Sequence, residues 1–200
     1  MICTTHILLK ARQTGLTMVE LLITLAVLAI LLAIGIPSFQ GLIASTRVTN
    51  ATNELLSAFA QARSEAIRQG QRVTICISAN GVQCTNAGNW EQGWIIFSDA
   101  TRAGNVANVD AGETIINNNR VSLTGITIQG AAALPRYISF SSDGQSRTLA
   151  GATQTGNIEV CSTSSALSDN DRARRLLVNG SGQIVMTQPA NINIACPTPP

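Results

Sequence analysis

One uninterrupted apolar stretch near the start of this 200-residue chain constrains its fold more than any other feature. No Asp, Glu, Lys or Arg occurs from Leu21 to Ile36. Counted from Leu16, the stretch reaches the roughly 20 residues that an α-helix needs to cross a ~30 Å hydrocarbon core. We therefore predict a membrane-spanning helix. Its one anomaly is Glu20, because a charged side chain at the centre of a bilayer costs about 2.5 to 3.5 kcal/mol on insertion scales and needs a partner.

Cleavage of the chain after Gly15 would provide that partner. The new α-amino group of Leu16 would be positively charged, and it would lie only four residues from Glu20. A positive charge at the N-terminus of a helix opposes the helix dipole. A carboxylate from a neighbouring copy, placed beside this amine, would lower the cost of both charges. We therefore predict that Glu20 acts in assembly.

The start of the chain resembles the class III signal of type IV prepilins and type II secretion pseudopilins. A short basic leader ends in Gly15, Leu16 and Thr17 follow it, Glu20 is the fifth residue after the cut, and Pro37 is the twenty-second. The resemblance implies cleavage by a prepilin peptidase, N-methylation of Leu16, and roles for Glu20 and Pro37 in assembly. It also implies four kinds of partner: other pilins or pseudopilins along the helix, the peptidase, an inner-membrane assembly platform, and membrane lipid.

Two other interpretations of this stretch are a secretory signal peptide and a plain N-terminal anchor. A secretory signal has an apolar core of about 7 to 15 residues with a small residue at the cleavage site behind it. Here the small residue, Gly15, precedes the apolar core, and a glutamate stands where a secretory signal would be apolar. The pattern therefore favours the pilin-like interpretation.

The charges of the chain indicate its orientation in the membrane. The formal net charge of +2 comes from Lys10 and Arg12 in the leader, so 13 minus 2 leaves 11 basic side chains against 11 acidic ones. Basic residues before a membrane helix keep its N-terminus in the cytoplasm. We expect a single-pass inner-membrane protein with a periplasmic C-terminal head that later enters a pilus or pseudopilus. A balanced charge supplies no general attraction for nucleic acid.

Four of the five cysteines follow the proposed cut, which is an even number in a chain exported to an oxidising compartment. Three connectivities exist for them. We favour the pairs Cys76 with Cys84 and Cys161 with Cys196. A zinc site is disfavoured because no CxxC pair occurs and His6, in the leader, is the only histidine. We expect no metal ion and no cofactor.

The hydrophobic periodicity predicts an α+β fold. After Pro37, apolar residues such as Leu55, Phe59 and Ala62 recur at three- and four-residue spacing up to Gly70, as in an amphipathic helix. From Gln71 the period changes to two. We therefore predict a long N-terminal helix, transmembrane and then amphipathic, packed on an antiparallel β-sheet head as in pilins. The predicted segments are a cleaved leader at 1–15, a membrane and assembly half at 16–37, an amphipathic half at 38–70 and a β-rich head at 71–200.

Candidate strands are separated by turn residues such as Asn80-Gly81 and Asp143-Gly144. The first candidate pair is a hairpin formed by Val73 to Ile77 and Val82 to Cys84. The others are Trp94 to Ser98, Thr114 to Asn117, Val121 to Gln129, Arg136 to Ser141, Asn157 to Ser162, Arg174 to Asn179 and Gln183 to Gln188.

An aromatic motif in the head makes the resemblance more specific. The residues Trp90, Gly93, Trp94 and Phe97 have the spacing W-x-x-G-W-x-x-F, which is similar to the signature of the FimT/GspH family of minor pilins and pseudopilins. Such aromatics would serve as core residues in any small β domain, but here they follow a class III leader. The resemblance implies a structural minor pilin of type IV pilus biogenesis or a priming tip. The alternative is the minor pseudopilin H of type II secretion, which we disfavour because of the cysteine-linked head.

Enzymatic activity is not expected. After the proposed cut the chain has no histidine and no lysine, and its serines lie in polar stretches without a nearby base. The acidic residues are scattered, so we assign no catalytic residue.

DNA capture is a further alternative, because the FimT branch of the family is associated with DNA uptake through a C-terminal G-R-x-R motif. The matching stretch, 182–185, reads Gly-Gln-Ile-Val and lacks both arginines. The only basic cluster is Arg172, Arg174 and Arg175, with two aspartates beside it, and alternation places the last two on opposite faces of a strand. We interpret the cluster as a solvated strand end with local ion pairs and do not expect a nucleic-acid partner.

Overall fold

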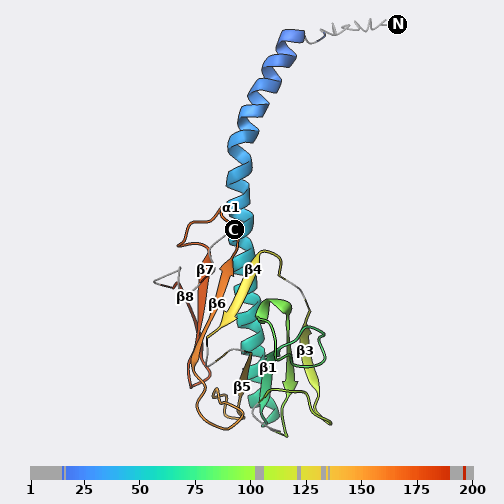
Figure 1. Cartoon of the computed structure of the whole chain (residues 1–200), viewed down its shortest axis with the longest axis vertical. Coiled ribbons are helices and arrows are strands. Elements are labelled where there is room, and N and C mark those ends of the chain that lie inside the picture. Colours follow the sequence, from blue (N-terminus) through green and yellow to red (C-terminus); the bar gives the residue numbers. More distant parts are fainter. Residues whose placement is uncertain are drawn as a thin grey trace, which may run out of the picture. The chain divides into compact units, whose positions relative to one another are not determined.

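Figure 1 shows a computed structural model of the chain. The structure describes residues 15, 17–101, 106–120, 123–131, 134, 136–189 and 196. A long helix, α1 (Met18–Gln69), precedes a short 3-10 turn, η1 (Trp90–Gln92), and a series of antiparallel strands. The strands are β1 (Val73–Ile77), β2 (Trp94–Ser98), β3 (Ile115–Asn119), β4 (Ile126–Gly130), β5 (Tyr137–Phe140), β6 (Gly156–Ser162), β7 (Ala173–Val178) and β8 (Ile184–Thr187). The predicted α+β class is confirmed.

The chain forms two compact units, with the boundary between Phe39 and Gln40. In the second unit, α1 buries one face, on which Val48, Leu55, Phe59 and Ala62 are all fully buried. Their spacing of three, four and seven residues brings them to the same side of a helix with 3.6 residues per turn. This face contributes to the main hydrophobic core, together with buried residues of both sheets.

The strands form two four-stranded sheets in the described part, with the orders β3-β2-β1-β5 and β4-β6-β7-β8. Figure 1 shows both of them alongside the second half of α1. Strand β1 is buried on both faces. Ile75 points into the main core, whereas Cys76 belongs to a second cluster with Ile95 and Phe97. The period of two in this strand therefore separates two apolar clusters rather than an inside from a solvated outside.

The predicted hairpin strand Val82 to Cys84 is wrong. The side-chain Oδ1 of Asn80 accepts hydrogen bonds from the backbone N–H groups of Val82 and Gln83, both at 2.9 Å, and so bends the segment into a turn. Strand β1 pairs instead with β2, with Ile75 opposite Ile96, and with β5 on its other edge.

The predicted strand from Val121 also needs correction, because β4 begins only at Ile126. A turn precedes it, in which the Ile126 N–H donates to the carbonyl of Leu123 and Gly125 adopts a φ of 76°. Only glycine enters this left-handed region at little cost, so the strand cannot extend through it. Val121 itself lies outside the described residues.

Candidate functional site

The described helix begins directly before the glutamate that we predicted to act in assembly. The Thr17 Oγ1 accepts a hydrogen bond of 3.2 Å from the Glu20 backbone N–H, and the Thr17 carbonyl accepts one from Leu21. Thr17 therefore caps the helix, and the Thr-x-x-Glu spacing is that of a capping box. We did not predict this role of Thr17, although Thr-x-x-Glu before an apolar run is the pattern that indicates it. The cap places the Glu20 carboxylate in the first turn.

The apolar segment after Glu20 exposes its side chains on all sides in the single chain. Between residues 21 and 36 the large apolar side chains have exposed fractions from 50% for Leu28 to 70% for Ile34. Among the described helical residues, α1 is the one helix long and apolar enough to cross a membrane, with a mean hydropathy of 2.8 in its most apolar window. A helix that is apolar all round needs lipid or neighbouring helices around it.

The structure does not test the predicted roles of Gly15, Leu16 and Pro37. Gly15 is exposed, and a Cβ added to it would meet no atom within 4 Å. Leu16 and the side chain of Pro37 lie outside the described residues. Cleavage, N-methylation and the assembly role of Pro37 therefore stay predictions.

The aromatic signature lies in the interior of the head. Trp90 is fully buried, and its ring packs edge-to-face on Phe59 of α1, with ring centroids 5.7 Å apart and an interplanar angle of 82°. Trp94 belongs to the same main core, whereas Phe97 belongs to the second cluster. The signature therefore joins the helix and both clusters. These side chains stabilise the fold rather than form a surface site.

Two non-aromatic residues of the same segment, Gly93 and Glu91, fix the backbone around the signature. Gly93 has a φ of 111°, and a Cβ there would collide with the backbone oxygen of Asn119 on β3. Only glycine fits this position without strain. The Glu91 Oε2 accepts a hydrogen bond of 2.9 Å from the Ile128 N–H, so η1 also holds strand β4 of the second sheet.

The structure contains the two disulfides that the sequence analysis favoured, Cys76–Cys84 and Cys161–Cys196, with Cα–Cα distances of 5.6 and 5.7 Å. The first lies beside the second apolar cluster, and the second fastens a C-terminal residue to β6. They are separated in sequence by 8 and 35 residues respectively.

We expect the longer disulfide to stabilise the head more. In the chain-entropy model, loops of 8 and 35 residues correspond to about 2.5 and about 3.8 kcal/mol. The pair Cys161→Ala with Cys196→Ala should therefore lower the free energy of unfolding by about 1 kcal/mol more than Cys76→Ala with Cys84→Ala. Guanidinium unfolding of the full chain in detergent measures both values. An equal or reversed order would show that packing around the buried Cys76 outweighs loop entropy.

The three arginines of the basic cluster turn toward different partners. Arg172 is buried, and its Nε donates to Asp169 Oδ1 at 2.9 Å. Arg175 donates to Glu159 Oε1 on the neighbouring strand at 2.5 Å. Arg174 donates to backbone carbonyls of its own segment. It lies opposite Val160, whereas Arg175 lies opposite Glu159, so the two arginines occupy opposite faces of β7. The geometry agrees with local ion pairs and does not assemble a basic patch.

We expect duplex DNA to bind the chain weakly, and two added arginines to strengthen the binding. Gln183 and Val185 are exposed beside the last hairpin, so Gln183→Arg with Val185→Arg would add two cations to the surface. Each cation that contacts a phosphate changes the slope of log K against log salt by about −0.9, so the double variant should steepen it by about 1.8. Fluorescence anisotropy in a salt series measures this slope. Tight binding by the unmodified chain, lost on replacement of Arg172, Arg174 and Arg175 by alanine, would contradict our interpretation of the cluster.

A second constellation, centred on Arg63 of α1, was not anticipated from the sequence. Its Nε donates to the Gly144 carbonyl at 3.0 Å and its Nη2 to the Ser181 carbonyl at 3.1 Å. Gly182 has a φ of 75°, and a Cβ there would collide with the Gly144 oxygen. Two turns that are distant in sequence thus meet over one guanidinium.

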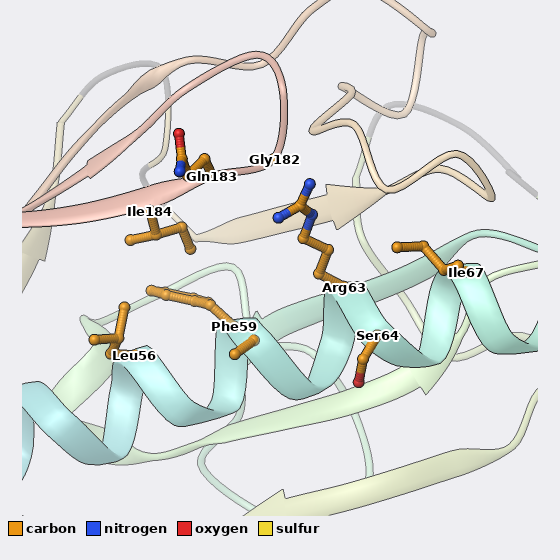
Figure 2. Close-up of a pocket in the computed structure, with 9 residues that line it drawn as sticks. Leu56, Phe59, Arg63, Ser64, Ile67, Gly182, Gln183 and Ile184 are labelled. Atoms are coloured by element: carbon orange, nitrogen blue, oxygen red, sulfur yellow. The ribbon is translucent and has the colours of Figure 1, made fainter.

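Beside this guanidinium lies a groove of about 450 Å³ between α1 and β8, which we call the Arg63 groove. Figure 2 shows Leu56 and Phe59 of α1 facing Ile184 of β8 across it, while Gln183 points away from α1. Its lining includes Leu56, Phe59, Arg63, Ile67, Gln183 and Ile184.

Comparison with known families gives two matches that together span most of the chain. A model described as type II transport protein GspH matches residues 51–182, about two thirds of the chain. A model described as the prokaryotic N-terminal methylation motif matches residues 10–36. The second match covers the predicted cleavage site and Glu20.

Individual proteins also resemble parts of the chain. Two fimbrial proteins of Pseudomonas aeruginosa are 43% identical over 61 residues, which is 30% of this chain and 39% of the relative. The chain therefore spans about two fifths of the length of these curated relatives. The crystal structure of the P. aeruginosa PAO1 type IV minor pilin FimU covers 74% of this chain and 96% of its own, with a TM-score of 0.53 and 16% identity. A second crystal form covers 72% and 98%, with a TM-score of 0.50 and 17% identity. At these identities the likeness shows the fold alone.

Proposed function

The chain belongs to the GspH family of type II transport proteins, and we propose that within this family it is a structural subunit of a type IV pilus, a minor pilin that acts in pilus biogenesis or in its priming tip. Its disulfide-linked head favours the pilus over type II secretion. One observation supports the role of a filament subunit most strongly: the methylation motif leads directly into an exposed apolar helix that Thr17 caps at the start of the turn with Glu20. The family is structural, and we propose no catalytic role. The segments that we propose are a leader at 1–15, an assembly half at 16–37, an amphipathic half at 38–70 and a head at 71–200.

The apolar helix anchors the chain in a membrane before assembly and packs against neighbouring subunits afterwards. We propose the inner membrane, with the N-terminus in the cytoplasm and the head in the periplasm, because the leader carries Lys10 and Arg12. Disulfides in the head fit an oxidising compartment. The prepilin peptidase and the inner-membrane platform are the partners that process and extract the subunit.

Assembly brings the Glu20 carboxylate of one subunit next to the α-amino group of Leu16 on its neighbour. Both charges would otherwise enter an apolar environment alone, at a cost of several kcal/mol each. The Thr17 cap holds Glu20 in the first turn, so the carboxylate and the amine lie at the same end of their helices. The pair also offsets the unfavourable position of a positive charge at a helix N-terminus.

We expect the mature chain to begin at N-methylated Leu16. The reason is that an uncut leader would leave its basic residues attached to the end that must enter the apolar filament interior. Mass spectrometry of the protein extracted from membranes of peptidase-competent cells checks this. Cells that lack the peptidase are the control and should contain the uncut chain. An uncut leader in competent cells would contradict the assignment.

One deletion strain distinguishes this proposal from two alternatives. A type II secretion pseudopilin and a DNA-capturing pilin would use the same processing and the same helix. Deletion of the coding sequence should abolish pilus-dependent motility and leave exoprotein secretion intact. Loss of secretion alone would make the chain the pseudopilin H, and loss of DNA uptake with normal motility would make it a DNA receptor. Complementation with the unmodified chain controls for effects on neighbouring genes.

A further inference from the structure

Among the described residues, strand β8 pairs with a neighbouring strand on one side alone. It is the last strand of the sheet β4-β6-β7-β8, so only β7 pairs with it in the described part. The Asn179 N–H donates to the Gln183 carbonyl at 2.9 Å and begins the ladder of this hairpin. In an antiparallel ladder such pairs recur at every second residue, here with Val185 opposite Leu177. The backbone groups of Ile184 and Met186 therefore point toward the free edge.

The Arg63 groove runs beside this free edge and has an apolar floor. In Figure 2, Leu56 and Phe59 of α1 approach Ile184 of β8. At its rim Ile67 is 53% exposed, and Met186, on the same face of β8 as Ile184, is 48% exposed. Exposed apolar side chains beside an unpaired strand edge are typical of a place where another chain adds a strand.

The charge in the groove is not neutralised by the head. The Nε and Nη2 of Arg63 are held by carbonyl oxygens, and no carboxylate among the described residues lies within ion-pair distance. The nearby Asp143 turns to its own loop, where the Ser141 hydroxyl and the Gln145 N–H bind its carboxylate and hold its pKa below the usual range. The Nη1 of Arg63 therefore remains available to an anion from outside.

We propose that the free edge of β8 and the Arg63 groove accept an extended segment of a partner subunit of the same filament. This segment adds a strand beside β8 through the backbone groups of Ile184 and Met186. One of its side chains is apolar and packs on the partly exposed Leu56 and on Ile67, and a nearby Asp or Glu binds Nη1 of Arg63. Charge complementarity favours this occupant over an apolar helix such as 21–36 of a second copy, which carries no carboxylate and no free backbone groups. The inference rests on the proposed function, because assembly is what brings partner subunits to this edge.

Photo-crosslinking in cells tests the proposal. A benzophenone side chain replaces Ile67, which is 53% exposed and lines the groove, in the full chain expressed by its own cells. After irradiation, the linked partner peptide is identified and its attachment site mapped by mass spectrometry. We expect one major adduct, from a non-helical segment with an Asp or Glu within about two residues of the link. The absence of an adduct, or attachment to a helix or to a segment without a carboxylate, would overturn the proposal.

Three variants in the same assay separate the strand edge from the charge. Met186→Pro removes an N–H that points to the free edge and leaves the bonds to β7 intact, so the adduct should fall about tenfold. Arg63→Gln should lower it about tenfold as well, whereas Arg63→Lys, which keeps the charge, should retain more than Arg63→Gln. The matched control is Val185→Thr, on the other face of the same strand, which should leave the yield unchanged. An equal loss in Val185→Thr would refute the edge geometry.

Two readouts distinguish this inference from the proposed function and from misfolding. Non-reducing gels show whether each variant still forms the Cys76–Cys84 and Cys161–Cys196 disulfides, and only variants that form them are scored. Sheared filaments from the same cells show whether the chain is incorporated. Incorporation without an adduct contradicts the docking site alone, whereas the mapped adduct without incorporation contradicts the proposed function alone.

Discussion

Replacement of Trp90 by alanine is expected to lower the free energy of unfolding of the head by about 3 to 5 kcal/mol. The side chain is fully buried, so its removal leaves a large cavity in the main core. It also removes the edge-to-face contact with Phe59, and such pairs contribute about 0.5 to 1.5 kcal/mol beyond the area that they bury. Guanidinium unfolding of the full chain in detergent, followed by the fluorescence of Trp94, measures the change.

The matched control for this prediction is Trp90→Phe. Phenylalanine retains an aromatic ring in the core, and it removes an indole Nε1–H that has no acceptor among the described residues. We expect Trp90→Phe to lower the free energy of unfolding by less than about half as much as Trp90→Ala, because it leaves a smaller cavity and no unpaired indole N–H. A loss below about 1 kcal/mol for Trp90→Ala would contradict the packing of the signature in the core.

The second large effect is expected from Glu20→Gln, which should reduce incorporation of the chain into filaments at least about tenfold. Glutamine keeps the size of the side chain and the Thr17 cap, whose hydrogen bond uses the backbone N–H of residue 20. It removes the negative charge, so the α-amino group of a neighbouring Leu16 would enter the filament unpaired. Quantitative immunoblots of sheared filaments against whole cells measure incorporation.

The control variant is Glu65→Gln on the same helix. Glu65 forms an exposed ion pair with Arg68 at 2.5 Å, a class of contact worth only about 0 to 1 kcal/mol. Incorporation should therefore stay at the level of the unmodified chain. Methylated Leu16 should still appear in the Glu20→Gln protein if the variant blocks assembly rather than processing. Equal incorporation of Glu20→Gln and the unmodified chain would show that the carboxylate is not needed.

The aromatic signature shows which features of the core the sequence predicts and which it does not. Its spacing identified Trp90, Trp94 and Phe97 as core residues and pointed to the family, and both conclusions agree with the fold. The spacing did not reveal that Trp94 and Phe97 enter different clusters on the two faces of β2. That division depends on which segments cover the second face, among them the loop residues Ala107 and Leu149. Leu149 lies 52 residues beyond Phe97.

The sequence by itself determined the elements whose cause is local. Three patterns depend on neighbours within a few residues: the charge-free run, the helical period up to Gln69 and the period of two at β1. Both α1 and β1 form where these patterns predict them. The failure at Val82 to Cys84 is also local, because the Asn80 side chain binds the backbone in a way that apolar alternation does not record. Only the tertiary structure decided the Arg63 groove, since Arg63 contacts carbonyl groups 81 and 118 residues away. A backbone carbonyl has no residue type to mark it, so contacts of this kind arise only when the sheets close on the helix.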